Sequence, residues 1–516
     1  MSKIYSFVDL PTPANLSATP VSGGTLVVGQ IYYYKIIGIA GSTTTAWEGK
    51  TKLSGEIFAT ANASNRSIRL QFTSPLVGGS KAFLVFRSTT PNGQLGEGTM
   101  LDNVFLNATV NSAGTVTITD NGISTFMGTY FLENDNDSHG RLTISGSTSA
   151  NRFSIVDLYN EDIAQGWGVI EKLDVNSYKV NCYLLISGTV WWADIAKTII
   201  FADAVRGSNV FNVNFGAIFG SQQTSLGCKI VISSTWLSEL KLGQLMAYRT
   251  SFQYVTPVVT ASGLGLVLST FNSGVMQDCS VDGFRGFQPE GGLNCTYNNF
   301  IMSNYDVGFG ANDANYNGVK LLEGSRIFQI RNQQVTARGL ISEGSSAALV
   351  VNSSSGRLTL IDSVITGSAP LFGNFVGNTN FQYFDQFSFN LIVYEEGTTT
   401  PIQNATVTIS NNIGQVFSVT TNSSGRIVEQ FVTRLFGLVS QISGATNFSY
   451  TERGPYRLVV ESQTHETYTE NFLMPTTIAQ SKIVSLRKQV EIIATTNGFA
   501  LSLDPKLGSN TTLQLL

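Results

Sequence analysis

The chain has 516 residues, of which 42% are hydrophobic and only 13% are Asp, Glu, Lys or Arg, against roughly 25% charged residues in an ordinary soluble domain. A chain this apolar is not intrinsically disordered, so its many Gly, Ser, Thr and Asn residues are expected in ordered turns and on strand faces. The net charge of −4, from 31 basic and 35 acidic residues, gives no field that would steer nucleic acid to the protein. We therefore expect no nucleic-acid partner.

The first residues, Met1 to Tyr5, lack the apolar core of a signal peptide. No later run reaches the roughly 18 apolar residues that a membrane span requires. We expect a protein that is made in a cytoplasm and has no membrane insertion. Its length allows about three or four domains.

Short apolar strands punctuated by Gly, Pro and Asn fill the chain from Met1 to Tyr130. Several strands at this spacing predict a β-sandwich over residues 1–130. The tyrosine-rich strand at 32–37 and the Val-Phe-Arg-Ser-Thr strand at 85–89 resemble the Ig-like fibronectin type III modules near the start of many bacteriophage structural proteins. The strand that carries this Val-Phe-Arg-Ser-Thr motif is expected at 83–88, and the other strands expected in this module lie at 68–72 and 115–120.

An acidic linker is expected at residues 131–140, which hold the densest acidic cluster of the chain. Glu133, Asp135 and Asp137 could supply hard oxygen ligands to calcium, but the later bidentate Glu of a calcium loop is missing. We favour a solvated hinge, with calcium binding by these three residues as the alternative.

The middle of the chain consists of short apolar runs broken every few residues by Gly, Asn, Ser or Asp. Each run is long enough for a strand and too short for a helix. This pattern predicts a right-handed parallel β-helix over residues 141–385, at the centre of an all-β chain. Bulky runs at 183–186 and 190–192 are expected to cap its open end. Segment 237–248 is compatible with a helix, but Gly243 favours strand and turn.

Two stretches of the predicted β-helix align with each other around Ser280 and Ser303. The positions of these serines differ by 303 − 280 = 23, a separation that suits one coil. Like side chains on neighbouring coils would then stack about 4.8 Å apart and could hydrogen-bond along the ladder.

In this register Asp282 and Asp306 would stack on neighbouring coils, with Asp278 and Arg285 nearby. Two stacked carboxylates repel each other and raise one pKa, as a general acid and base require. The alternative, which we favour, is that each Asp sits at a turn and accepts hydrogen bonds from local backbone N–H groups. These four residues are catalytic candidates only if the protein is an enzyme.

Three tyrosines of the same region, Tyr297, Tyr305 and Tyr316, are candidates for stacking on sugars if their rings are exposed. Tyrosine in a strand more often contributes to packing. The sequence alone leaves both roles open.

Other catalytic or metal-binding patterns are not found. The two histidines, His139 and His465, fall in separate predicted domains, so a Ser-His-Asp or Cys-His site is not expected. The cysteines have no Cys-x-x-Cys spacing for zinc, and could pair or be small buried side chains; we favour buried free thiols. We expect no cofactor, no metal and no enzymatic activity. The cysteines are Cys182, Cys228, Cys279 and Cys295.

The segment from 386 to 482 carries an ordered set of short motifs: a strand at 389–394, Pro-Ile-Gln-Asn-Ala-Thr-Val-Thr-Ile at 401–409, Thr-Asn-Ser-Ser-Gly at 421–425 and Gly-Pro-Tyr-Arg-Leu-Val-Val at 454–460. It resembles the carboxypeptidase regulatory-like β-sandwich of transthyretin type, with Asn422 where Asp is common and an insertion at 434–453. The resemblance implies a non-catalytic module. Residues 483–516 would add strands or a docking tail.

This order of modules resembles bacteriophage virion proteins of the tail fibre, spike or capsid decoration kind. The resemblance implies a virion component that presents surfaces for host attachment, with other virion proteins and a host surface glycan as partners, and a homotrimeric assembly. One alternative is a tailspike polysaccharide depolymerase, a glycan hydrolase or lyase. A second alternative is a bacterial surface adhesin.

Overall fold

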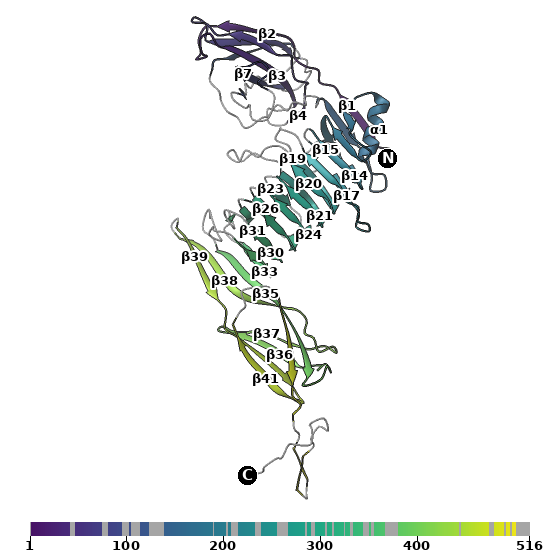
Figure 1. Cartoon of the computed structure of the whole chain (residues 1–516), viewed down its shortest axis with the longest axis vertical. Helices are drawn as coiled ribbons and strands as arrows, with labels where there is room; N and C mark the ends of the chain where they lie inside the picture. The colour runs from purple at the N-terminus through teal and green to yellow at the C-terminus, as the bar shows by residue number, and fades with distance from the viewer. Residues whose placement is uncertain are drawn as a thin grey trace. The chain divides into compact units, whose positions relative to one another are not determined.

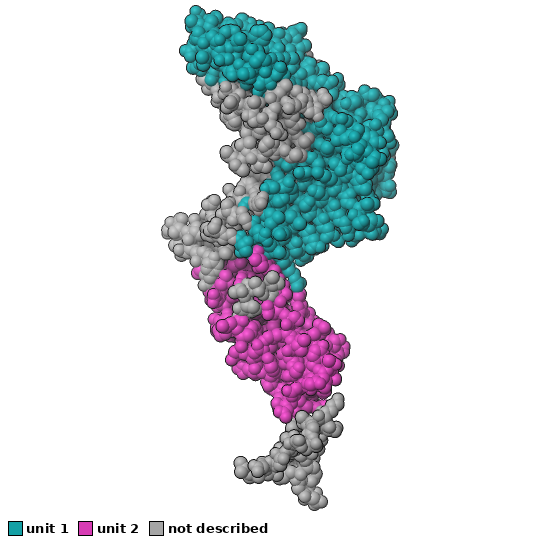
Figure 2. All heavy atoms as spheres, viewed as in Figure 1, with its two compact units in different colours: residues 1–356, 365–377 teal, residues 357–364, 378–516 magenta. Residues whose placement is uncertain are grey.

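The described part of the chain is almost entirely β-structure, as predicted, with the single helix α1 among its elements (Figure 1). It forms two compact units, residues 1–356 with 365–377 and residues 357–364 with 378–516 (Figure 2). The computed structural model describes residues 2–501 except 42–46, 75–80, 95–102, 105–113, 123–138, 189, 203–204, 208–214, 233–238, 255–266, 284–285, 290–294, 305–306, 312–313, 323, 325, 331–333, 344–349, 352–355, 367–379, 443–444, 474–478, 490–491 and 496–497.

Two antiparallel sheets form the N-terminal sandwich of the first unit. Their inward side chains share one core, which includes Tyr34 and Ile36 from one sheet and Leu70 and Phe72 from the other. The strands expected at 32–37, 68–72, 83–88 and 115–120 are all present. One sheet is β2 (Ala14–Val21), β6 (Ser67–Ser74) and β9 (Gly114–Asp120); the other is β4 (Trp47–Lys50), β3 (Ile31–Gly41), β7 (Lys81–Ser88) and β8 (Asn103–Val104), with β5 (Ile57–Thr60) beside β3.

A parallel β-helix with three faces follows, which confirms the predicted architecture. Face A begins with the four-stranded sheet and continues over one half of the long strands β19 and β21. Its strands are β1 (Ile4–Val8), β10 (Arg141–Ser145), β13 (Tyr183–Ile186), β16 (Val205–Gly207), β19 (Glu239–Tyr248), β21 (Val267–Gln277), β23 (Gly286–Pro289), β26 (Val307–Ala311), β29 (Arg326–Ile330) and β32 (Val350–Val351).

Face B takes the other half of β19 and β21, and face C is a separate sheet. Strand β19 confirms the strand expected near 237–248. Face B also contains β14 (Val190–Asp194), β17 (Phe215–Phe219), β24 (Cys295–Asn298), β27 (Ala314–Asn317) and β30 (Gln334–Arg338). Face C contains β11 (Ile170–Lys172), β12 (Ser177–Val180), β15 (Thr198–Phe201), β18 (Lys229–Ile232), β20 (Ser251–Tyr254), β22 (Ser280–Asp282), β25 (Ile301–Ser303), β28 (Lys320–Leu322) and β31 (Ile341–Glu343).

The register of the coils differs from the one expected. Ser280 pairs with Ile301, so this coil spans 301 − 280 = 21 positions rather than 23, and Asp282 lies opposite Ser303. Apolar side chains that alternate along each strand fill the bore, and this alternation sets the register. One inward row contains Phe219, Ala247, Met276, Tyr297, Tyr316 and Ala337.

The cap of the β-helix is formed by different residues from those expected. Segments 183–186 and 190–192 are coil strands, and the cap consists of β1, antiparallel to β10, and helix α1 (Ile155–Gln165). Ser154 begins α1 with a capping box to Asp157, and Gly166, with a φ of 69°, ends it. The antiparallel strand covers a sheet edge that would otherwise offer unpaired backbone groups.

The second unit contains a β-sandwich built around the long strand β35 (Asn380–Glu395). This strand pairs with β33 (Arg357–Ile361), antiparallel with β38 (Gln430–Ile442) and parallel with β42 (Gln480–Leu486). The expected insertion at 434–453 belongs to a hairpin of β38 and β39 (Ala445–Glu452). The facing sheet is β37 (Gly414–Thr420), β36 (Thr406–Asn411), β40 (Tyr456–Ser462) and β41 (His465–Phe472); β34 (Val364–Ile365), β43 (Ile492–Thr495) and β44 (Gly498–Leu501) complete the elements.

Candidate functional site

A repeated backbone turn joins face B to face C, and we call it the BC corner. One residue of each turn has a left-handed backbone, with φ of 49° at Arg249, 55° at Asp278 and 51° at Asn299. Gly318 and Gly339 continue the row with φ of 62° and 63°. The N–H groups of the first four corner residues each donate to the next coil, for example Asp278 N to Asn298 O at 2.9 Å. The backbone ladder therefore continues around the corner.

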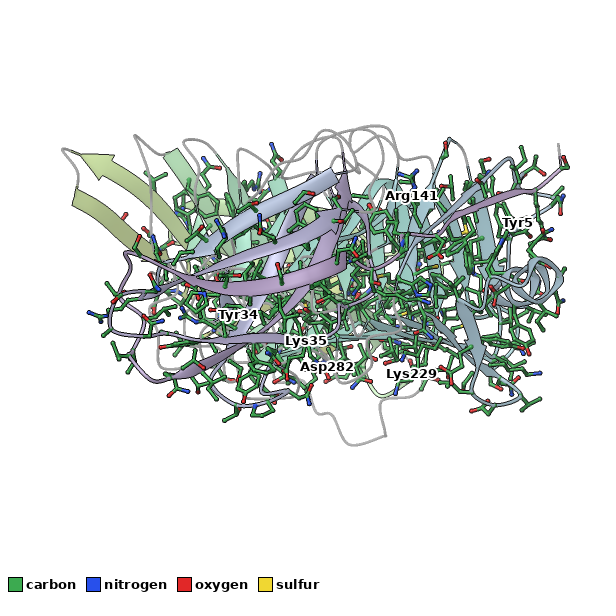
Figure 3. The ribbon with its side chains drawn as sticks, turned by 90° about the horizontal axis from the view of Figure 1, so that it is seen from above. Tyr5, Tyr34, Lys35, Arg141, Lys229 and Asp282 are labelled. Carbon is green, nitrogen blue, oxygen red and sulfur yellow. The ribbon has the colours of Figure 1, made fainter. Side chains whose placement is uncertain are left out.

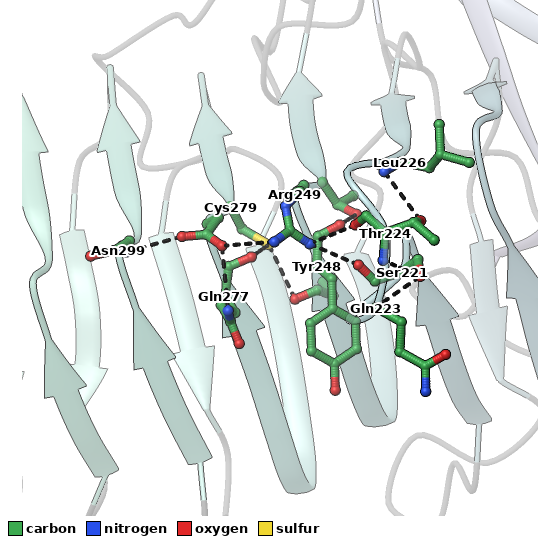
Figure 4. Close-up of polar contacts among 12 residues, drawn as sticks. Ser221, Gln223, Thr224, Leu226, Tyr248, Arg249, Gln277, Cys279 and Asn299 are labelled. Atoms are coloured by element: carbon green, nitrogen blue, oxygen red, sulfur yellow. Dashed lines mark hydrogen bonds and ion pairs between the residues drawn. The ribbon is translucent and has the colours of Figure 1, made fainter.

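Three corner side chains form a second ladder, which we call the corner ladder: Arg249, Asp278 and Asn299. Figure 4 labels Arg249 and Asn299 and marks the contacts of the ladder by dashed lines. Arg249 Nη1 donates to the carbonyl oxygens of Ser221 and Thr224 at 2.8 and 2.9 Å. Asn299 Nδ2 donates to Asp278 Oδ1 at 3.0 Å. Arg249 Nη2 lies 3.9 Å from Asp278 Oδ2, and both side chains are about a third exposed, at 35% and 34%, so this ion pair contributes little stability.

Local chemistry explains which residue types occupy the corner. Asp and Asn tolerate the left-handed region because their short polar side chains hydrogen-bond nearby, and Gly enters it without a Cβ clash. Each corner residue is followed by a buried side chain: Thr250, Cys279, Phe300, Val319 and Leu340.

The carboxylate of Asp282, at the opposite end of β22, also accepts hydrogen bonds from the next coil. Its Oδ1 accepts hydrogen bonds from Ser303 Oγ at 2.7 Å and from Asn304 Nδ2 at 2.8 Å, both from the next coil. Asp282 and Lys229 belong to face C and lie toward the same side of the molecule in Figure 3. Asp282 therefore bridges two coils.

The coil register on which stacking of the catalytic candidates depended is not the one observed. Asp282 lies opposite Ser303, so the register that would place Asp306 on it is wrong. Asp278 and Asp282 flank strand β22, and each accepts hydrogen bonds from the following coil. Arg285 and Asp306 lie outside the described residues.

Two of the three tyrosine candidates are buried rather than exposed. Tyr297 and Tyr316 are 0% and 1% exposed, and their rings stack with centroids 5.2 Å apart. They point into the bore because they lie on the inward row with Met276 and Ala337. Neither ring presents a face to a sugar, and Tyr305 lies outside the described residues.

Three of the cysteines, Cys182, Cys228 and Cys279, are buried free thiols, as favoured from the sequence. Burial raises the pKa of Cys279 to about 12, so its thiol stays protonated at neutral pH. Among the described residues, no three His, Cys, Asp or Glu side chains come together in a way that could hold a metal ion. Glu133, Asp135 and Asp137 lie outside the described residues.

Sequence reasoning missed Arg249 and the loop 221–226 that its guanidinium holds. The signal was present as an irregular repeat: successive corner positions differ by 278 − 249 = 29, 299 − 278 = 21, 318 − 299 = 19 and 339 − 318 = 21.

No family model, curated protein or solved structure that was compared with the chain matches it. Within the described part of the chain, no helix is both long and apolar enough to span a membrane.

Replacing Asp278 by alanine is expected to lower the free energy of unfolding of the β-helix by about 1–2 kcal/mol, because alanine removes the acceptor of Asn299 and tolerates the left-handed region poorly. Asp278→Asn is the matched control, expected to cost only about 0.5 kcal/mol or less because asparagine tolerates this backbone and retains an acceptor oxygen. Urea unfolding measures both, and equal midpoints for the two variants would contradict the ladder's role.

Proposed function

We propose that the protein is a structural component of a bacteriophage particle, of the fibre, spike or decoration kind, and that its β-helix carries surfaces for attachment to the host. The observation that supports this most directly is the continuous ladder: coil after coil is joined by parallel backbone pairs, and the BC corner adds its own hydrogen bonds. Such a stack resists local opening, because each coil can open only by breaking its pairing with both neighbours.

The β-sandwiches of the two units support the same proposal, since they supply modules for assembly beside the scaffold. We propose a non-catalytic role, because the described carboxylates of the candidate site, Asp278 and Asp282, bridge coils. We propose other virion proteins as its partners, a homotrimer as its assembly and the virion as its location. A host surface glycan is the proposed target.

Gold-labelled antibodies against the recombinant protein test this proposal, applied both to purified phage particles and to uninfected bacteria. Labelling at a fixed position on the particle is the expected result, and that position distinguishes a head from a tail component. Labelling of uninfected cells with bare particles would overturn the proposal in favour of a bacterial surface adhesin.

A further inference from the structure

An exposed row of apolar side chains lies at the capped end of the BC corner, and we call it the apolar ridge. It consists of Leu173, Val175, Ile195 and Leu226, which are 47%, 74%, 49% and 48% exposed. They come from three turns: 173–176 between β11 and β12, 195–197 between β14 and β15, and 221–226 between β17 and β18. Further along the same corner the polar corner ladder and then glycine take their place.

Hydrogen bonds hold the three turns side by side. Lys197 Nζ donates to Asn176 Oδ1 at 2.9 Å, which joins the first turn to the second. Ala196 N donates to Gly227 O at 3.0 Å, which joins the second turn to the third. The Leu226 side chain points away from Arg249 and its polar partners (Figure 4). The ridge therefore presents its apolar atoms from a rigid support.

Four lysines lie in these turns or in the strands that flank them, and we call them the lysine fringe: Lys172, Lys179, Lys197 and Lys229. Lys197 Nζ lies 5.8 Å from the centroid of the Tyr178 ring. Lys172 Nζ lies 5.9 Å from the same ring and 5.8 Å from that of Tyr159. These contacts hold two ammonium groups beside the turns. Lys229 is on the next coil, since its N–H donates to Lys197 O at 2.9 Å.

Two acidic residues of the same turns and strands only partly offset the fringe. Glu171 pairs with Lys179 across β11 and β12. Asp174 lies between two ridge residues, and its Oδ1 accepts from Asn176 N and Ser177 N at 2.7 and 2.8 Å. These hydrogen bonds hold the pKa of Asp174 below its usual value. Over residues 170–180, 195–198 and 220–229, the four lysines and these two carboxylates leave a charge of 4 − 2 = +2. Asp194, which precedes Ile195, is buried.

We propose that the apolar ridge and the lysine fringe together form a docking surface for an anionic lipid bilayer. Exposed aliphatic side chains flanked by lysines match the interface of such a bilayer, where apolar atoms enter the acyl boundary and ammonium groups meet the headgroups. A two-fold contact with a second copy would place the lysines of the two fringes against each other, and their like charges would repel. An acidic peptide would engage the lysines but would leave the ridge in water.

The test is co-flotation of the full chain with vesicles of phosphatidylcholine alone and of phosphatidylcholine mixed with phosphatidylglycerol. Binding is expected only with phosphatidylglycerol, and it weakens as salt rises. Lys172→Gln and Lys229→Gln are each expected to weaken vesicle binding about fivefold. The double variant Val175→Ser with Leu226→Ser is expected to weaken it roughly tenfold or more.

Matched controls use exposed residues that belong to neither the ridge nor the fringe. Val428→Ser, at 76% exposure, controls for the double serine variant, and Lys52→Gln controls for the lysine variants; neither is expected to change binding. Three results would overturn the proposal: no vesicle binding, equal binding to neutral vesicles, or equal losses in surface and control variants. Self-association that depends on the ridge, without vesicle binding, would assign the surface to a second copy. The assay uses no particle, so its failure leaves the virion proposal standing.

Discussion

Replacing Asp120 by alanine is expected to lower the free energy of unfolding of the N-terminal sandwich by about 3–5 kcal/mol. Asp120 is 1% exposed and accepts from Tyr34 Oη at 2.8 Å and from Gly122 N at 2.9 Å. Arg87 Nη1 lies 3.0 Å from both of its carboxylate oxygens. Burial and the neighbouring carboxylate raise the pKa of Tyr34, so its hydroxyl remains a donor. Alanine would leave the Arg87 charge buried without its partner.

Hydrogen exchange of peptides from β3, β6 and β9 in the full chain measures this loss. The equilibrium constant for opening of these strands should rise about a hundredfold or more. Glu56→Ala is the control, since the Glu56 carboxylate accepts from Asn92 N at 2.7 Å at an exposed position and should cost about 1 kcal/mol or less. Adding Arg87→Leu to Asp120→Ala should recover part of the loss. Equal exchange in Asp120→Ala and Glu56→Ala would contradict the buried network.

The second large effect is a pH dependence of the free energy of unfolding, which is caused by Asp194 at the capped end of the β-helix. Its side chain occupies the inward row of the bore, where it accepts from Ile155 N at 3.1 Å and from the Trp192 indole. Burial raises the pKa of Asp194 to about 7, although these two hydrogen bonds favour the charged form. Asp157 on α1 raises this pKa further, and Lys197 lowers it.

Because the folded pKa lies above the unfolded value near 3.8, the folded state holds a proton that the unfolded chain releases between these pH values. The resulting stabilisation is complete below about pH 4 and is lost as pH rises through about 7. From pH 5 to pH 8, the loss from this group should be about 3 kcal/mol. Asp194→Asn should abolish this part of the slope.

Urea unfolding at pH 5 and pH 8 tests the Asp194 effect. Tryptophan fluorescence reports on this end, because Trp167, Trp191 and Trp192 are three of the five tryptophans. Glu161→Gln, a change of another α1 carboxylate, is the control and should retain the wild-type slope. A slope that persists unchanged in Asp194→Asn would show that other groups cause it.

The strands were predictable from the sequence because their alternation follows directly from one buried face, as in 83–88 and 115–120. The coil register was not, because Ser280 and Ser303 resemble each other by composition while inward side chains and left-handed corner residues set the true pairing. The cap was missed since α1 has only 11 residues, and its capping box uses Asp157 where Glu is usual.

The candidate site was less predictable than the fold. Asp278 and Asp282 were singled out as carboxylates near turns, and the favoured turn role agrees with the hydrogen bonds that they accept. Arg249 was missed because the repeat of corner positions is irregular and its partners are backbone carbonyls of a loop on another coil. Exposure of Tyr297 and Tyr316 could not be inferred without the register, since a one-residue shift moves a ring from the bore to the surface.

Because the coils of the β-helix differ in length, the fold can tolerate insertions and deletions during evolution. Successive corner residues keep one backbone conformation, although the spacing of their positions varies from 318 − 299 = 19 to 278 − 249 = 29. Length is therefore absorbed away from the BC corner, at segments that do not set the stacking. Insertions in these segments should lower the free energy of unfolding only slightly. Surface loops can therefore be gained or lost while the β-helix keeps its fold.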